Sequence, residues 1–232
     1  MNLISISGPP SCGKTSVILK TIEAFKEKGL QVGVVKFDCL YTDDDKLYEK
    51  AGVPVKTGLS GSLCPDHYFV SNIEEVVQWG LARSLDVLIT ESAGLCNRCS
   101  PYLKNVSSVC VIDNLSGINT PKKIGPMLKS ADIVVITKGD IVSQAEREVF
   151  ASKVQMANSK AIILHVNGLN GQGAYELSGL LYKESENLTT VRGLELRYPM
   201  PSALCSYCLG EKRIGEEYQL GNVRKIDWGD EI

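Results

Sequence analysis

The chain has 232 residues and a formal net charge of −2. Its length suits one full α/β domain with a substantial core and a small appendage. The near balance of acids and bases excludes a basic surface for nucleic acid or an anionic membrane. No run of about 18 apolar residues is present, so no membrane-spanning segment is expected. We therefore expect a cytoplasmic protein that binds neither nucleic acid nor membrane.

Strands and helices are predicted to alternate along most of the chain. Apolar runs predict strands at 3–6, 30–37, 86–90, 108–112, 132–136 and 161–166, and helical spacing predicts helices at 16–28, 144–157 and 175–182. The pattern Ser71-Asn72-Ile73-Glu74 predicts that another helix begins there, because it matches a capping box. Buried strands between helices predict a three-layer α/β fold of the P-loop NTPase type with a mostly parallel sheet.

The alternation ends near residue 182, which predicts two parts of the chain. Residues 1–182 are predicted to form a nucleotide-binding domain. Residues 183–232 are expected to form a linker and a small C-terminal appendage that carries cysteines.

The segment from Gly8 to Thr15 reads GPPSCGKT, a complete G-x-x-x-x-G-K-T phosphate loop between a predicted strand and a predicted helix. That context supports the motif, since the loop N–H groups and the helix N-terminus then converge on phosphate oxygens. Lys14 is predicted to reach the β and γ phosphates and Thr15 to hold Mg²⁺. The residues expected around the phosphates are Gly8, Pro9, Ser11, Cys12, Gly13, Lys14, Thr15 and Ser16.

Acidic residues follow two of the predicted strands. Asp38 ends the second strand and is expected to accept a hydrogen bond from an attacking water or from a water on Mg²⁺. The run Asp43 to Asp45 comes next, and each member could serve the site or simply be solvated. Glu91 and Gly94 form an E-x-x-G pattern after the strand at 86–90. The acid is expected to sense the γ phosphate through Mg²⁺ or water, and the glycine through its N–H.

The sequence Thr137-Lys138-Gly139-Asp140 follows the strand at 132–136. An acidic side chain there can accept hydrogen bonds from N1–H and the 2-amino group of guanine, which adenine lacks. Asp140 is therefore predicted to select GTP. The stem of Lys138 is expected to pack along the base, and Thr137 to brace the loop.

Eight cysteines are many for a chain in a reducing compartment, where metal binding or redox chemistry is a better explanation than disulfides. Cys64 and His67, in the sequence CPDH, suit Zn²⁺ or Ni²⁺. Two C-x-x-C pairs are candidates for a metal ion or an iron–sulfur cluster, and whether they meet in one site is left open. Their members are Cys96 with Cys99, and Cys205 with Cys208.

Together these motifs resemble the nickel-inserting GTPases of hydrogenase and urease maturation, the HypB and UreG type. The resemblance covers about residues 1–182 and rests on GPPSCGKT, DCLYTDDDKLYEKAGVPVKTG, CPDH, DVLITESAG and TKGD. It implies that GTP binding orders switch loops and drives formation of a homodimer. It also implies that a Cys–His motif from each subunit forms a metal site at the dimer interface.

Carried over by position, the resemblance gives each motif a role. Lys14, Asp38, Glu91 and Gly94 are the expected catalytic residues, and Thr15 with the two acids would hold Mg²⁺. Asn167 is expected near the guanine ring. An aspartate separates Pro65 from His67, and the C-x-x-C pairs are not general features of the family, so the metal and the client enzyme stay open.

The main hypothesis is a slow GTPase that acts as a metallochaperone, delivering nickel, zinc or a metallocluster to a client metalloenzyme or its maturation complex. One alternative is a nucleotide-binding iron–sulfur or redox sensor, or an ATP-dependent metallocluster maturation factor. Another is a P-loop kinase, although no arginine-rich lid of the kind that closes on phosphates is evident in the sequence.

Overall fold

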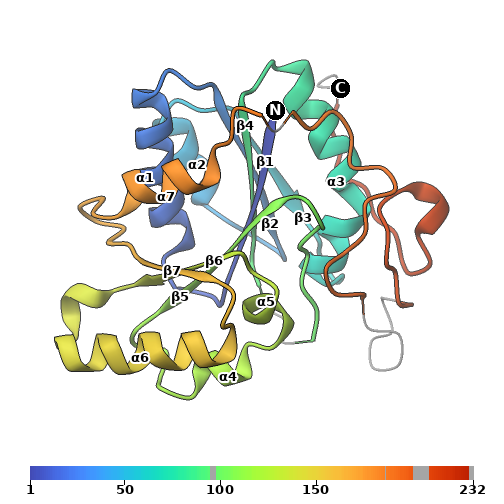
Figure 1. The fold of residues 1–232 in the computed structure, drawn as a ribbon. Coiled ribbons are helices and arrows are strands. Elements are labelled where there is room, and N and C mark those ends of the chain that lie inside the picture. The colour runs from blue at the N-terminus through green and yellow to red at the C-terminus, as the bar shows by residue number, and fades with distance from the viewer. Residues whose placement is uncertain (95–97, 186, 201–208, 230–232) are drawn as a thin grey trace.

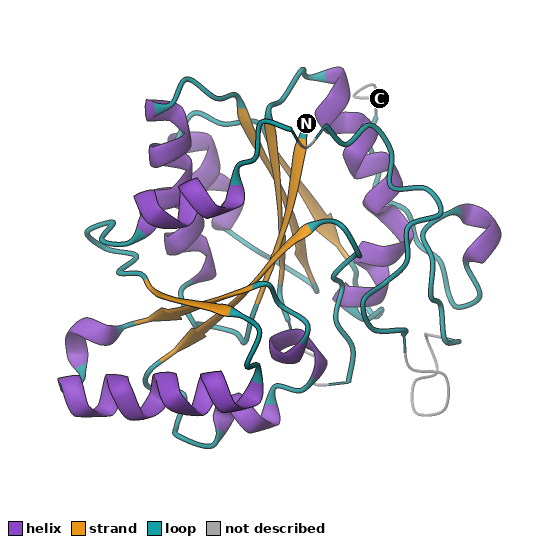
Figure 2. Cartoon of the chain, in the orientation of Figure 1, coloured by secondary structure: helices purple, strands orange, loops and turns teal. Residues whose placement is uncertain are grey.

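The computed structural model describes residues 1–94, 98–185, 187–200 and 209–229. Its centre is one twisted sheet of seven strands, in the order β3-β2-β4-β1-β5-β6-β7 (Figure 2). All neighbouring strands in the described chain pair in parallel. The strands are β1 (Asn2–Ser7), β2 (Val32–Asp38), β3 (Val55–Leu59), β4 (Val87–Ser92), β5 (Ser107–Asp113), β6 (Ile133–Thr137) and β7 (Ile162–His165). The predicted α/β fold is confirmed.

Helices cover both faces of the sheet, which makes three layers. One face carries α1 (Lys14–Glu27), α2 (Asp44–Lys50) and α7 (Ala174–Leu181), which lie together in Figure 1. The opposite face carries α3 (Pro65–Ala82), α4 (Thr120–Lys123), α5 (Pro126–Lys129) and α6 (Gln144–Ala157). Short 3₁₀ helices span Gly139–Ile141 and Glu216–Tyr218.

Successive residues of each strand point to opposite faces, and the core follows that alternation. Ile89 of β4 packs in the cluster with α1, whereas its neighbour Leu88 packs in the cluster with α3. On β2, Val34 joins the α1 cluster and Phe37 joins the α3 cluster. The rings of Phe37 and Phe69 meet edge to face, with centroids 5.1 Å apart. Each central strand therefore supplies residues to both sides of the sheet.

The fold differs from the sequence prediction in the start of one helix and in short elements that were not predicted. The helix expected to begin at Ser71 begins at Pro65, because proline is favoured in the first helical turn. Ser71 lies inside this helix, and its hydroxyl donates to the carbonyl of His67. By contrast, the capping box that starts at Ser143 is present and opens α6. Strand β3 and helix α2 were not predicted, since both are short and carry polar residues.

The C-terminal segment packs along α3 (Figure 1). Its buried residues join the α3 cluster, and the backbone N–H of Ile226 donates to the Asn72 side chain over 2.7 Å. The rings of Trp79 and Trp228 lie 6.2 Å apart. The buried contributors are Val191, Leu196, Met200, Ile214 and Ile226. Within the described ranges, none of the helices has both the length and the hydropathy that crossing a bilayer requires.

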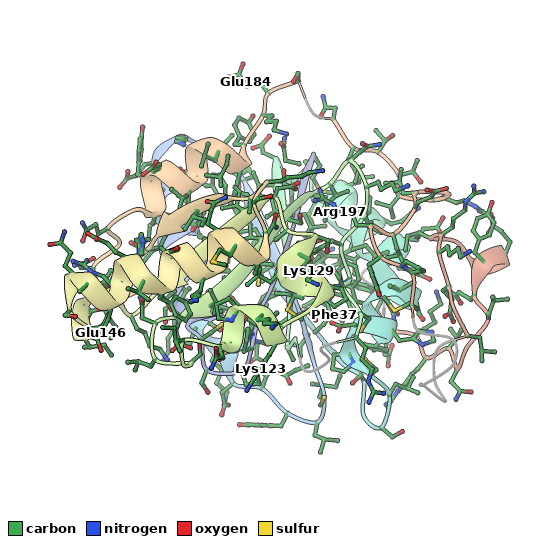
Figure 3. The ribbon with its side chains drawn as sticks, turned by 60° about the horizontal axis from the view of Figure 1, so that its bottom comes forward. Phe37, Lys123, Lys129, Glu146, Glu184 and Arg197 are labelled. Carbon is green, nitrogen blue, oxygen red and sulfur yellow. The ribbon has the colours of Figure 1, made fainter. Side chains whose placement is uncertain are left out.

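Arg197, labelled in Figure 3, holds this segment to the strand region. Its guanidinium forms two hydrogen bonds of 2.6 Å with the carboxylate of Asp132. It also donates to the backbone carbonyls of Leu103, Val106 and Ser130. One side chain thus satisfies a carboxylate and three carbonyls at once.

We expect Arg197→Ala to lower the free energy of unfolding by about 3 kcal/mol, because it leaves several partly buried acceptors without a donor. The midpoint of urea unfolding would measure this loss. Arg192→Ala is the matched control, since Arg192 pairs with Glu217 at the surface and should leave the midpoint nearly unchanged. Equal midpoints for the two variants would contradict the structural role of Arg197.

Candidate functional site

The phosphate loop joins β1 to α1 in a backbone conformation that glycine favours. Gly13 has a φ of +90°, and Ser11 also lies in the left-handed region at +59°. The ammonium of Lys14 donates to the carbonyls of Gly8 and Pro9 over 3.0 and 2.9 Å. The loop therefore curls around its own lysine, and this positive charge lies where the motif predicts phosphate binding.

Cys12 has a packing role within this loop. Its side chain is fully buried, and its thiol donates to the carbonyl of Val111 over 3.2 Å. Burial raises the pKa of the Cys12 thiol, which makes it unreactive. The predicted contribution of Cys12 to nucleotide binding rests on its backbone.

Gly94 lies against the phosphate loop. Its φ is +59°, and a Cβ at this position would be 2.3 Å from the carbonyl oxygen of Gly8. Only glycine allows two backbones to approach so closely in this conformation. The E-x-x-G turn and the phosphate loop are therefore in direct contact through their backbones.

Glu91 lies at the end of β4 and is fully buried. Its Oε1 accepts a hydrogen bond from the Thr15 hydroxyl over 3.0 Å and lies 2.8 Å from the ammonium of Lys36. Its Oε2 accepts from the Tyr48 hydroxyl over 2.7 Å. Glu91 thus joins the first residues of α1 to β2 and α2.

Asp44, the first residue of α2, completes this group of charges. Its Oδ2 lies 2.6 Å from the Lys36 ammonium and accepts from the Thr15 hydroxyl over 3.1 Å. Asp38 is farther away, with its carboxylate 3.9 Å from the same ammonium. Burial alone would lower the pKa of Lys36, but Glu91 and Asp44 raise it above the usual range. Burial opposes ionisation of Asp44, yet Lys36 lowers the pKa of that carboxyl.

These oxygen atoms fit a hard divalent cation such as Mg²⁺, which takes carboxylate and hydroxyl ligands. The structure brings two of the predicted magnesium ligands, Thr15 and Glu91, into direct contact. Asp38 does not contact them directly, but its carboxylate lies 3.9 Å from the Lys36 ammonium, which contacts Glu91. Asp44 is a further oxygen donor at the same place.

A pocket of about 280 Å³ adjoins the phosphate loop on the side of β6 and β7. The Thr137 hydroxyl donates to the carbonyl of Cys12 over 2.6 Å, and Lys138 donates to the carbonyl of Ser11 over 2.7 Å. These two hydrogen bonds tie the segment after β6 to the phosphate loop. The pocket is lined by Gly13, Ser16, Thr137, Lys138, Asp140, Ile141, Asn167, Gly168 and Leu169.

Asn167 shapes the wall of this pocket. Its side-chain oxygen accepts from the backbone N–H groups of Leu169 and Asn170. Asp140 lies in the short 3₁₀ helix that follows β6. The predicted guanine-binding residues Thr137, Lys138, Asp140 and Asn167 thus line one pocket.

A second group of functional side chains lies on the α3 face. The ligand atoms of Cys64, Asp66 and Cys99 are all within 4.8 Å of one another. The Cys99 thiol donates to one oxygen of Asp66 over 3.2 Å, and the Ser92 hydroxyl donates to the other over 3.0 Å. The contact with Cys99 lowers the pKa of the Cys64 thiol. We call Cys64, Asp66 and Cys99 the thiol–carboxylate group.

Asp66 is 1% exposed. Burial raises its pKa, and the hydrogen bonds from Cys99 and Ser92 offset this only in part. No ion pair joins Asp66 to a basic side chain in the part of the chain that the structure describes. A buried carboxylate beside two thiols is a suitable setting for a thiophilic cation, which would supply the missing positive charge.

His67 lies apart from the thiol–carboxylate group. Its Nε2 is 3.3 Å from Oε1 of Glu211, and both side chains are buried. The carboxylate of Glu211 also accepts from the backbone N–H groups of Leu209 and Gly221. His67 therefore contacts the C-terminal segment, and its role as a metal ligand stays a prediction. The other predicted ligands Cys96, Cys205 and Cys208 lie outside the described residues.

Sequence reasoning missed several residues that the structure brings to these sites. Lys36 interrupts an apolar strand, which was an available signal of a buried ion pair. Tyr48 and Asp66 gave no such signal, because their roles depend on tertiary contacts. Cys39 was also missed. Burial raises the pKa of its thiol, a hydrogen bond with Ser60 opposes this rise, and the nearby charge of Asp38 adds to it.

Comparison with known proteins identifies the family. The model of the CobW/HypB/UreG nucleotide-binding domain matches residues 2–165, so the chain belongs to this family. An uncharacterized protein of Methanocaldococcus jannaschii is 49% identical over 227 residues, covering 98% of this chain and 97% of the relative. The urease accessory protein UreG of Edwardsiella ictaluri is 29% identical over 196 residues, covering 78% and 93%.

Solved structures agree on the fold. The hydrogenase maturation factor HypB from Archaeoglobus fulgidus is similar at a TM-score of 0.63 and 21% identity, with coverage of 78% of this chain and 88% of that one. HypB from Helicobacter pylori, solved in complex with nickel, has a TM-score of 0.61 at 20% identity, with coverage of 81% and 92%.

Gly94→Ala should abolish nucleotide binding, because the added Cβ would collide with the Gly8 carbonyl and distort the phosphate loop. Titration with a fluorescent guanine nucleotide would measure this loss. Gly179→Ala is the control, since its Cβ would meet nothing within 4 Å in helix α7. It should bind normally and gain about 0.5–1 kcal/mol of stability. Normal nucleotide affinity in a folded Gly94→Ala protein would contradict the contact.

Proposed function

We propose that this protein is a GTP-hydrolysing metallochaperone, in which the nucleotide state controls the binding and release of a transition-metal ion or metallocluster for a client enzyme. Family membership supports the nucleotide-binding part of the proposal. The metal part draws support from the thiol–carboxylate group and from two relatives, one named a urease accessory protein and the other solved with nickel.

One observation carries the proposal. Glu91 and Ser92 are neighbours at the end of β4 and point to opposite faces of the sheet. Glu91 contacts Thr15 of the phosphate loop, and Ser92 contacts Asp66 of the thiol–carboxylate group. A change in the position of Glu91 on nucleotide binding would therefore be transmitted to Ser92 through a single peptide unit.

The nucleotide chemistry follows from the side chains around the phosphate loop. Lys14 and the loop N–H groups would stabilise charge on the transferring phosphoryl group. Mg²⁺ would neutralise charge on the β and γ phosphates when it is bound through Thr15 and Glu91. Asp38, partly exposed at the end of β2, would orient the attacking water. We expect hydrolysis to be slow and its catalysis to be mainly electrostatic.

Guanine selectivity would come from the pocket between the loops after β6 and β7. Asp140 can accept from both N–H donors of guanine, and Asn167, whose side chain accepts from the Leu169 N–H, lines the same pocket. We propose GTP as the nucleotide for this reason.

The cargo would bind at the thiol–carboxylate group. Two thiolates and a carboxylate suit Zn²⁺ and also accept Ni²⁺. Cys96, Cys205, Cys208 and His67 are further possible donors. We propose that a homodimer forms when nucleotide binds, and that it works with a client maturation complex. The location is expected to be the reducing cytoplasm, because the thiols must stay free.

Asp140→Asn should weaken GTP binding by about 10- to 100-fold, because a hydrogen-bonded charge is worth roughly 1.5–3 kcal/mol. ATP binding should be unchanged. Phosphate release from GTP and ATP would provide the measurement, with Asp227→Asn at the C-terminal segment as the control. If the variant keeps its preference for GTP, the guanine assignment is wrong. Separately, transfer of phosphate to an acceptor other than water would favour a kinase.

Cobalt substitution tests the cargo site, since thiolate ligation of Co²⁺ gives an intense near-ultraviolet band. Cys64→Ser and Cys99→Ser should each reduce the band at saturating Co²⁺ by about half, since one thiolate remains, and weaken binding by more than about 100-fold, which exceeds the usual effect of a residue that only orients a ligand. Cys110→Ser is the control, because Cys110 is buried within β5. A full band in both cysteine variants would exclude this group as the cargo site.

A further inference from the structure

Lys36 is a lysine in the middle of a buried strand. Its side chain is 4% exposed, and the preceding residues of β2 are valines and a glycine. Burying an ammonium group is unfavourable unless it is fully paired. On the neighbouring strand its register partner is Glu91, so the lysine and the acid are adjacent by sheet geometry.

Lys36 contacts the same carboxylate oxygens that lie beside the Thr15 hydroxyl. Its ammonium lies 2.6 Å from Oδ2 of Asp44 and 2.8 Å from Oε1 of Glu91. The Thr15 hydroxyl oxygen lies within hydrogen-bond distance of these same two oxygens, at 3.1 and 3.0 Å. In P-loop NTPases, Mg²⁺ is held between the threonine or serine of the loop and an acid at the end of a nearby strand. An ammonium and a magnesium ion would therefore need the same oxygens.

We propose that Lys36 is a built-in competitor of Mg²⁺, a positioning residue whose ammonium must leave Asp44 and Glu91 before the ion can bind there. This inference rests on the proposed nucleotide site and goes beyond it. Two cations a few ångströms apart on shared oxygens repel each other strongly in a buried site. Asp38 lies on the same face of β2, 3.9 Å from the ammonium, and gives the displaced lysine another partner.

The competition has a consequence for α2. Asp44 begins this helix, and its contact with Lys36 holds the helix start against β2. Displacement of the lysine by Mg²⁺ changes what Asp44 is bound to, whereas loss of Mg²⁺ restores the ion pair. Asp38 and Asp44 lie at the two ends of the segment that includes Cys39. Both carboxylates are partners of Lys36 in this exchange, so the exchange acts on both ends of the segment. Lys36 thus makes the position of that segment depend on the ion.

The test is the Mg²⁺ concentration that half-saturates the full chain bound to a fluorescent GDP analogue. Lys36→Met keeps the length of the side chain and removes its charge. We expect it to lower the half-saturating Mg²⁺ concentration tenfold or more, which corresponds to about 1.4 kcal/mol. Lys225→Met, which breaks a pair with Glu75 at α3, should leave this value unchanged. An unchanged or higher value in a folded Lys36→Met protein overturns the proposal.

A measurement on the wild-type chain removes the dependence on this variant folding. With ¹⁵N-labelled lysine, the paired and buried ammonium of Lys36 should give a signal protected from solvent exchange, identified by its loss in Lys36→Arg. Adding Mg²⁺ with GDP should shift or broaden that signal, and GDP alone should not. A signal that ignores Mg²⁺ overturns the proposal. Failure of the wild type to bind any guanine nucleotide would instead overturn the proposed function.

Discussion

The buried ion pair between Lys36 and Glu91 is the contact on which the nucleotide side of this structure depends. This ion pair joins β2 to β4. Glu91 also contacts Thr15 at the start of α1 and Tyr48 of α2, and Lys36 contacts Asp44 of α2. Buried ion pairs contribute little net stability, because desolvation offsets most of their attraction. An apolar pair of similar volume would stabilise the contact between the two strands equally well. The charges therefore fit the proposed binding of Mg²⁺ better than a role in folding alone.

The alternation of side chains along the central strands connects this charged site with the thiols. Lys36 and Glu91 face α1, whereas Phe37 and Ser92 face α3. Phe37 packs against Phe69, and Ser92 binds Asp66, so both strands reach the same helix. Neither connection needs a long pathway of intervening residues. The proposed coupling between the two sites would follow from the period of a β-strand, since Glu91 and Ser92 are adjacent residues of β4.

Much of the fold could be predicted from the sequence, because its signals are local. The phosphate loop, the buried strands and the capping box at Ser143 each depend on residues close together in the chain. The nucleotide pocket could be anticipated as well, since parallel strands bring their carboxyl ends to one edge of the sheet. The start of α3 could not, because Ser71 has the pattern of a cap and only the preceding Pro65 decides otherwise. The contacts of Asp66 and Tyr48 depend on the tertiary fold.

The thiol–carboxylate group shows how one residue changes a site. Successive residues of an α-helix are rotated by about 100° around its axis, since a turn holds about 3.6 residues. Asp66 and His67, both in the first turn of α3, therefore leave the helix in different directions. Asp66 faces Cys99, and His67 is turned toward Glu211 of the C-terminal segment. The aspartate between Pro65 and His67 thus places a carboxylate beside the thiols, whereas the imidazole lies beside Glu211 of the C-terminal segment.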